Sequence, residues 1–135
     1  MSKDSAVFGL DTSVVLRLLV GEPIHQAEAA LRFVETEAAA NRPCQVCDLV
    51  IAEAYFALHA HYQVPKSEAL VALLSLLTSG QVEPTEQAVR SLRSALTASA
   101  KPGFVDRLIH EHYLPARLAT FLKAAARLPT SQLLG

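Results

Sequence analysis

The sequence lacks the features that mark membrane and secreted proteins. Its longest apolar stretches, such as residues 69–77, are well short of the ~20 residues that a membrane-spanning helix needs. The residues that follow Met1 contain neither the apolar core nor the cleavage site of a signal peptide. We therefore expect a cytoplasmic protein with no membrane partner.

Glycine-rich motifs and cysteines are also scarce. The sequence contains no G-x-x-x-x-G-K-[ST], G-x-G-x-x-G or G-x-S-x-G motif. Its two cysteines, Cys44 and Cys47, form a C-x-x-C pair. Structural zinc needs four ligands, and a redox pair of this type should open a helix. Because this pair lies in what reads as a short apolar strand, we expect two buried, unreactive thiols.

Long runs of like charge are missing as well, and this favours a folded chain. Only 19% of the 135 residues are charged, the formal net charge is −1, and 51% of the residues are apolar. Such a composition disfavours disorder and supplies enough apolar surface for one core. We expect a single domain over residues 1–135, because no linker, repeat or low-complexity tract interrupts it.

Apolar runs of strand length alternate with helical patterns along the chain. Strands are expected at residues 6–10, 44–47, 81–84 and 117–121. Helices are expected at residues 14–20, 25–41, 49–62, 65–80, 85–99 and 104–113, with a short helical tail after the last strand. This alternation predicts an α/β fold with helices on the faces of a short, mainly parallel sheet of about four or five strands.

Ligands of such a sheet bind outside the carboxyl ends of the strands, and this rule singles out Asp11. Asp11 directly follows the first expected strand and precedes Thr12 and Ser13. Two interpretations stay open. The carboxylate either binds a ligand or serves as the N-cap of the next helix, which is a common role of Asp before a helix.

Glu53 is a second candidate because its helix looks apolar on all sides. Its neighbours three and four residues away are Leu49, Val50, Phe56 and Ala57. A helix that is apolar all round is expected to be buried, and an unpaired carboxylate there costs several kcal/mol. A metal ion, a buried cationic partner or a raised pKa would each compensate for that cost.

Asp106 lies near the start of the helix predicted at residues 104–113 and borders its apolar stripe. Arg107 and Glu111 are four residues apart, which is the spacing of a surface ion pair. The carboxylate of Asp106 is either a ligand or an acid that simply favours the first helical turn. Three acids near strand ends or on a buried helix suggest a shared all-oxygen site. Mg²⁺ or Mn²⁺ suits such ligands, and the natural chemistry is phosphodiester hydrolysis.

The order and spacing of these segments resemble the PIN domain family, in particular the VapC-type toxins of toxin–antitoxin pairs. The resemblance rests on Val7-Phe-Gly-Leu-Asp-Thr-Ser-Val-Val-Leu16, on residues 46–58 around Glu53, on Gly103-Phe-Val-Asp-Arg-Leu-Ile109, and on Leu118-Ala-Thr-Phe121. It implies a three-layer α/β/α domain and a metal-dependent endoribonuclease, with Asp11, Glu53 and Asp106 as metal ligands and catalytic residues. It also implies an RNA substrate, a small antitoxin that blocks the site, and a homodimer.

One position departs from the family pattern. A fourth Asp commonly follows the last strand, and this sequence has Leu122 there, followed by Lys123. Either three acids suffice for one metal, or the domain has lost cleavage and is a non-catalytic RNA- or protein-binding module. Ser13 and Thr120 are possible hydroxyl partners of a metal-bound water or a phosphate, and Lys123 is a possible phosphate contact.

His110 is a further possible accessory residue, since it lies one helical turn after Asp106. It would enter the surroundings of the metal, replace part of the missing fourth acid, or face water. The pairs His59-x-His61 and His110-x-His112 do not suit a metal, because residues two apart on a helix point in nearly opposite directions.

Overall fold

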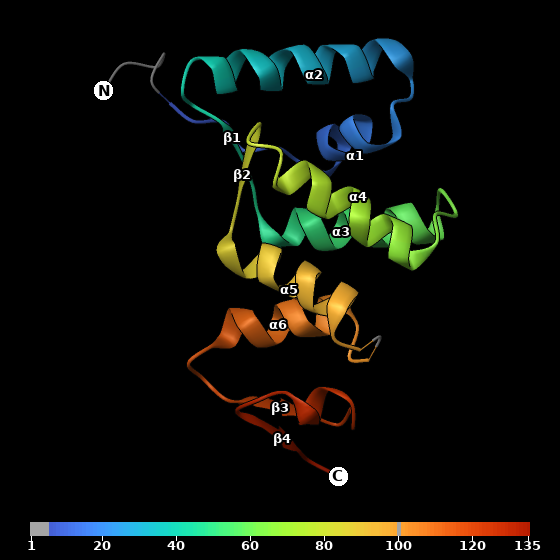
Figure 1. The fold of residues 1–135 in the computed structure, drawn as a ribbon, viewed down its shortest axis with the longest axis vertical. Coiled ribbons are helices and arrows are strands. Elements are labelled where there is room, and N and C mark those ends of the chain that lie inside the picture. The colour runs from blue at the N-terminus through green and yellow to red at the C-terminus, as the bar shows by residue number, and fades with distance from the viewer. Residues whose placement is uncertain (1–5, 100) are drawn as a thin grey trace. The chain divides into compact units, whose positions relative to one another are not determined.

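The computed structural model describes residues 6–99 and 101–135. The expectation about the segment Met1–Ser5 therefore lies outside the described residues. The chain divides into two compact units, the first ending at Thr85 and the second beginning at Glu86, and each is described by itself. Figure 1 labels the helices and strands.

Three short parallel segments form the sheet of the first unit. Strand β1 (Cys44–Val46) pairs in parallel with β2 (Val82–Pro84). On the other side of β1, Gly9 forms a single parallel bridge to Gln45, and the amide of Leu10 donates to the Gln45 carbonyl at 2.9 Å. The strand expected at residues 6–10 is thus reduced to one bridge. Its carboxyl end still lies at the same edge of the sheet as those of β1 and β2.

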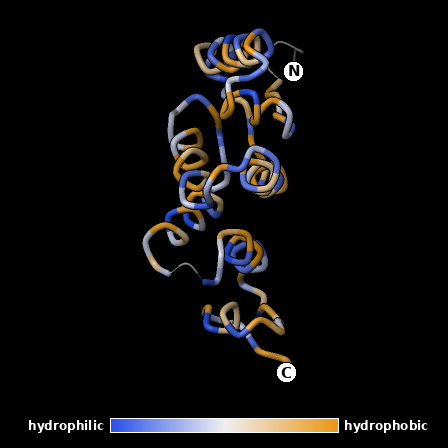
Figure 2. The backbone as a smooth tube through the Cα atoms, turned by 90° about the vertical axis from the view of Figure 1, so that its right-hand side faces the viewer, coloured by the Kyte–Doolittle hydropathy of each residue, from blue (hydrophilic) through white to orange (hydrophobic). Residues whose placement is uncertain are grey.

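Four helices complete the first unit: α1 (Thr12–Val20), α2 (Ile24–Ala39), α3 (Asp48–Ala60) and α4 (Lys66–Leu77). Helix α1 ends at Gly21, whose φ of 78° is favourable for glycine and costly for other residues. Along these helices hydrophobic residues recur among hydrophilic ones (Figure 2). The buried core includes Val15, Val34, Cys44, Val46, Ile51, Ala54, Leu58, Leu73 and Val82.

The second unit is built on a helix pair. Helix α5 (Glu86–Thr97) packs against α6 (Phe104–Tyr113), and the apolar residues between them include Leu92, Phe104 and Leu108. Strand β3 (Leu118–Thr120) pairs in parallel with β4 (Ser131–Leu133), and the short 3₁₀ helix η2 (Ala125–Arg127) connects them. The expected helical tail is therefore only partly correct, because a fourth strand follows the single helical turn.

The fold class agrees with the prediction: over residues 6–99 and 101–135, six α-helices and short parallel strands make a small, mainly helical α/β protein. One local expectation at the start of α3, the burial of Cys47, was wrong. Cys47 is exposed and occupies the N-cap position, while Asp48 lies in the first helical turn. Cys44 is buried as expected, and burial raises the pKa of its thiol. None of the helices in the described part of the chain is long and apolar enough to cross a membrane.

Candidate metal and nucleic-acid site

The Asp11 carboxylate is fixed at the N-terminus of α1. Its Oδ1 accepts a hydrogen bond from the Ser13 hydroxyl at 2.6 Å and another from the Val14 amide at 3.2 Å. Asp11 is therefore the N-cap of α1, as one of the two interpretations required. The cap does not exclude binding, because the Ser13 hydroxyl and the Val14 amide both donate to Oδ1 and Asp11 is exposed.

The same hydrogen bonds set the charge of Asp11. Donation by the Ser13 hydroxyl, followed by donation from the Val14 amide, lowers the pKa of the Asp11 carboxyl below its ordinary value of 3.8. The group is consequently ionised at neutral pH without a metal ion. An ionised, exposed carboxylate is a suitable ligand for a hard divalent cation.

Glu53 reaches the beginning of α1 from helix α3. The hydroxyl of Thr12 donates a hydrogen bond to Glu53 Oε1 at 2.9 Å. Because Thr12 follows Asp11 directly, this bond brings the second predicted acid to the end of α1 that Asp11 caps. The structure thus associates Asp11 and Glu53, and the other oxygen of Glu53 has no partner among the described residues.

The expected burial of Glu53 was wrong. Glu53 is exposed, and on the same face of α3 the side chains of Leu49 and Phe56 are 78% and 55% exposed. The helix is buried only on its opposite face, through Val50, Ile51, Ala54, Tyr55 and Leu58. Glu53 therefore needs no compensating partner to be stable, and the physical argument that demanded one does not hold.

Asp106 lies in the second unit, in the first turn of α6. It is partly exposed, and its carboxylate makes no hydrogen bond or ion pair with any residue the structure describes. Both oxygens are accordingly free to bind a ligand. Its joint action with Asp11 and Glu53 stays a prediction, because those two residues belong to the other unit.

Arg107 does not pair with Glu111, contrary to the expectation from their spacing. Arg107 is buried, and its guanidinium donates to the carbonyls of Pro102 at 2.9 Å and Ser99 at 3.1 Å. Glu111 instead accepts from Arg90 of α5 at 3.2 Å. Arg107 therefore holds the loop that leads into α6 and thereby supports the turn that carries Asp106.

Two of the possible accessory residues of the second unit, His110 and Thr120, have structural roles. His110 is buried, and its Nε2 lies 2.5 Å from the Pro129 carbonyl oxygen, so the ring faces neither water nor a metal ligand. Thr120 Oγ1 accepts from the Leu122 amide at 3.0 Å, which closes the turn after β3. Leu122 and Lys123 are both exposed.

A polar pair at the sheet edge was not predicted as part of the site. Asp48 follows β1 and Thr85 follows β2, and the Thr85 hydroxyl donates to Asp48 Oδ1 at 2.6 Å. The rule that singled out Asp11 applies equally to these residues, because both follow parallel strands. Asp48 begins helix α3 directly after β1, and its carboxylate lies at the sheet edge beside Thr85.

The donors of the first unit suit a hard cation in type but are few in number. Asp11 and Glu53 offer carboxylate oxygens, and Ser13 and Thr12 offer hydroxyls. Within each unit, no three His, Cys, Asp or Glu side chains of the described residues are grouped closely enough to hold a metal ion. Two carboxylates completed by water are compatible with Mg²⁺, which keeps several of its waters in protein sites.

A parallel sheet edge with a capped aspartate and a neighbouring glutamate defines an α/β domain with an acidic, oxygen-rich site. Residues 9–118 match the PIN domain family, and the chain belongs to that family. PIN domains are three-layer α/β/α proteins, are generally nucleases and generally use divalent metal ions. Neither the curated proteins nor the solved structures contained a match to the chain.

Proposed function

We propose that this PIN domain is a Mg²⁺- or Mn²⁺-dependent endoribonuclease of the VapC type, the toxin of a toxin–antitoxin pair that acts in the cytoplasm. Asp11, Glu53 and Asp106 are the proposed metal ligands and catalytic residues. The observation that carries the proposal is the hydrogen bond from Thr12 to Glu53, which brings a carboxylate of α3 to the helix end capped by Asp11. Family membership supplies the nuclease class.

Each residue contributes a defined task to hydrolysis. Ser13 holds the Asp11 carboxylate in one orientation, and Thr12 orients Glu53. A bound divalent ion supplies charge neutralisation at the phosphate and an ordered water as nucleophile. Asp106, whose oxygens have no partner among the residues that the structure describes, completes the proposed anionic set. Hydrolysis by a water positioned in this way leaves a 3′-hydroxyl on the RNA.

A second function is favoured by one specific feature. Leu122 stands where the family commonly has a fourth acid, and it is 55% exposed. A domain with this substitution can retain RNA or protein binding after loss of cleavage. The alternative proposal is therefore a degenerate PIN domain that serves as a non-catalytic binding module.

Cleavage of single-stranded RNA in Mn²⁺ tests both proposals. The wild type should cut, Asp11→Asn should lose at least about 100-fold in rate, and the matched surface variant Glu83→Gln on β2 should keep its rate. If the wild type does not cut RNA and only the Leu122→Asp variant does, the chain is a degenerate nuclease. Failure of every variant to bind Mn²⁺ in calorimetry would refute a metal site at these residues.

The toxin role and the assembly need their own measurements. Expression of an active toxin should arrest growth of the host cell, and Asp11→Asn should relieve that arrest. Light scattering of the purified chain should give the mass of a homodimer. An RNase without any effect on growth would contradict the toxin role while leaving the enzymatic proposal intact.

A further inference from the structure

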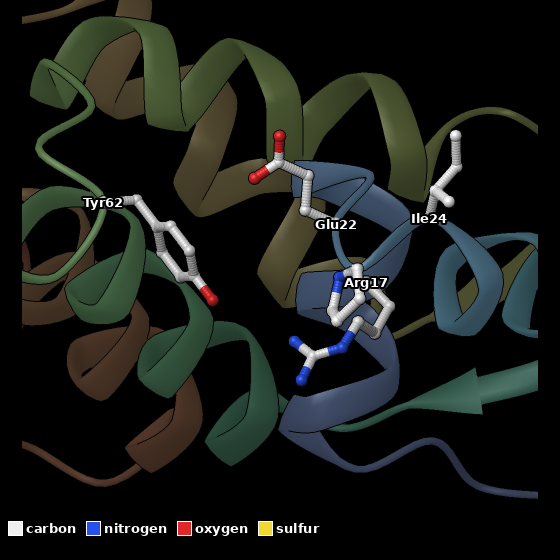
Figure 3. Close-up of a pocket in the computed structure, with 5 residues that line it drawn as sticks. Arg17, Glu22, Ile24 and Tyr62 are labelled. Carbon is white, nitrogen blue, oxygen red and sulfur yellow. The ribbon is translucent and has the colours of Figure 1, made fainter.

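A pocket in the first unit contains a cation and an aromatic ring that the proposed metal site does not use. Its volume is about 540 Å³, within the ~300–1,000 Å³ range of small-ligand sites, and it is lined by Arg17, Glu22, Pro23, Ile24 and Tyr62. In Figure 3 the Arg17 guanidinium and the Tyr62 hydroxyl point into the open space, whereas the Glu22 carboxylate points away from them. The pocket thus has one basic and one aromatic wall.

Arg17 is oriented for binding. Its Nε donates to Gln26 Oε1 at 2.7 Å, which fixes the plane of the guanidinium. The two terminal nitrogens have no hydrogen-bond or ion-pair partner among the described residues. A planar guanidinium with two free nitrogens matches the oxygens of a phosphate group in bidentate geometry.

Tyr62 is held in place but keeps its ring accessible. Its amide donates to the Ala57 carbonyl at 3.1 Å, and its ring packs edge-on against His61 at a centroid distance of 5.0 Å. The side chain remains 37% exposed. An anchored, accessible aromatic ring is the kind of surface on which unpaired nucleobases stack.

The pocket and the acidic site share the same two helices. Helix α1 packs against α3, Arg17 lies in the last turn of α1, and Tyr62 follows the end of α3. Ser13, which binds Asp11, and Arg17 are four residues apart and share one face of α1. At 1.5 Å per residue the separation along the helix is ~6 Å, which is on the order of one nucleotide step.

From these relations we infer that the pocket of Arg17 and Tyr62 binds one nucleotide of single-stranded RNA next to the bond that is cut. This inference rests on the proposed nuclease function. The base stacks on the Tyr62 ring, and its phosphate accepts hydrogen bonds from Arg17. The Glu22 carboxylate repels phosphate from the opposite rim, so the nucleotide binds in one orientation.

RNA binding without cleavage tests the inference apart from the enzymatic proposal. Fluorescence anisotropy of a labelled single-stranded RNA of about 12 nucleotides is measured in EDTA, which prevents metal-dependent cutting. Arg17→Ala should weaken binding by about tenfold and reduce the slope of log affinity against log salt by about 0.7. Tyr62→Ala should weaken binding by at least about fivefold, and Tyr62→Phe should stay within about twofold of wild type.

Matched control variants distinguish an effect of the pocket on RNA affinity from a general effect of lost positive charge. Arg32→Ala on α2 removes the same charge from an exposed position of the same unit and should leave the affinity within about twofold. Arg17→Lys, which keeps the charge but loses the planar fork, should be intermediate. Circular dichroism establishes that each variant folds, and Tyr62→Ala carries the test independently if Arg17→Ala does not fold.

The outcomes distinguish the two proposals. If Arg17→Ala and Tyr62→Ala bind like Arg32→Ala while the wild type cuts RNA in Mn²⁺, the nucleotide pocket is refuted and the nuclease remains. If the pocket variants lose binding and the wild type never cuts, the pocket stands and the nuclease fails. An affinity that falls in Arg17→Ala but is unchanged in Tyr62→Ala would show a phosphate-ion site without base stacking and would overturn the inference. A wild type that binds no RNA in EDTA overturns the pocket, and a wild type that neither binds nor cuts RNA in Mn²⁺ overturns both proposals.

Discussion

The hydrogen bond between Thr12 and Glu53 is the feature on which the proposed site depends, and Thr12→Val removes it with little change in volume. A hydrogen bond to a charged group contributes about 1.5–3 kcal/mol, but water replaces part of it where the partners are accessible. Thr12 is partly exposed and Glu53 is exposed, so we expect a loss of about 1 kcal/mol in the free energy of unfolding. This energy corresponds to a factor of about five in an equilibrium constant.

Two measurements check the prediction. Urea unfolding should give the loss of stability, and RNA cleavage at a series of Mn²⁺ concentrations should show a half-maximal concentration raised about fivefold. Thr36→Val on α2 is the matched control, because its hydroxyl bonds only the Arg32 carbonyl of its own helix at 2.7 Å. Equal behaviour of the two variants in both assays would refute the orienting role. A loss of stability with an unchanged Mn²⁺ dependence would show that the bond is structural and that Glu53 does not bind the metal.

Three further predictions concern other parts of the chain. Arg107→Met should lower the free energy of unfolding by about 2–4 kcal/mol in a urea titration, because it leaves two loop carbonyls without their charged donor. An unchanged urea midpoint would show that these two hydrogen bonds of Arg107 do not stabilise the fold. Ser13→Ala should raise the pKa of the Asp11 carboxyl toward 3.8 in an NMR titration, because the largest lowering contribution is removed. A carboxyl whose pKa is lowered by folding stabilises the folded state at pH values above its unfolded pKa, and this stabilisation is lost as the pH falls through the folded pKa. The Ser13→Ala variant should therefore lose less stability than the wild type when the pH is lowered below about 4. Leu73→Ala, at a fully buried position, should cost about 2–5 kcal/mol, whereas Val71→Ala on the exposed face of the same helix should cost far less.

The fold was predictable where the chain has clear stop signals. Helix α6 spans Phe104–Tyr113 as expected, because Gly103 precedes it and Pro115 follows it closely. Strand β4 was missed because Ser131–Leu133 is three residues long and shows no alternating pattern. Its strand character comes from parallel pairing with β3, which is a non-local contact that no local pattern reports.

At the candidate site, too, non-local contacts of single residues were not predictable from local sequence patterns. Asp11 was found by a rule of topology, and the geometry agrees with its position at a strand end. The burial of Glu53 was misjudged because an apolar sequence on every side of α3 does not say which face meets another element. Arg107 was misassigned because spacing identifies a possible ion pair but cannot reveal that loop carbonyls compete for the same guanidinium.

The exposure of the acids changes what a metal ion must do for this protein. A buried, unpaired Glu53 would have made the fold depend on a bound cation, because removal of the metal would leave a desolvated charge. With Asp11 ionised and Glu53 exposed, the first unit has no such dependence. Treatment with EDTA should therefore leave the unfolding midpoint of the purified chain unchanged.

Added metal should stabilise the folded chain, because a cation that binds only the folded state shifts the folding equilibrium by mass action. A cation that binds only the folded chain raises the free energy of unfolding by about 2.7 kcal/mol at 100 times its dissociation constant. Asp11→Asn should lose this gain, and Glu83→Gln should keep it, because Glu83 lies exposed on β2 and is not a proposed ligand. A large drop in stability on EDTA treatment would mean that metal binding is part of folding and that Glu53 is not solvated as the structure has it. An equal gain in Asp11→Asn would instead place the metal elsewhere on the chain.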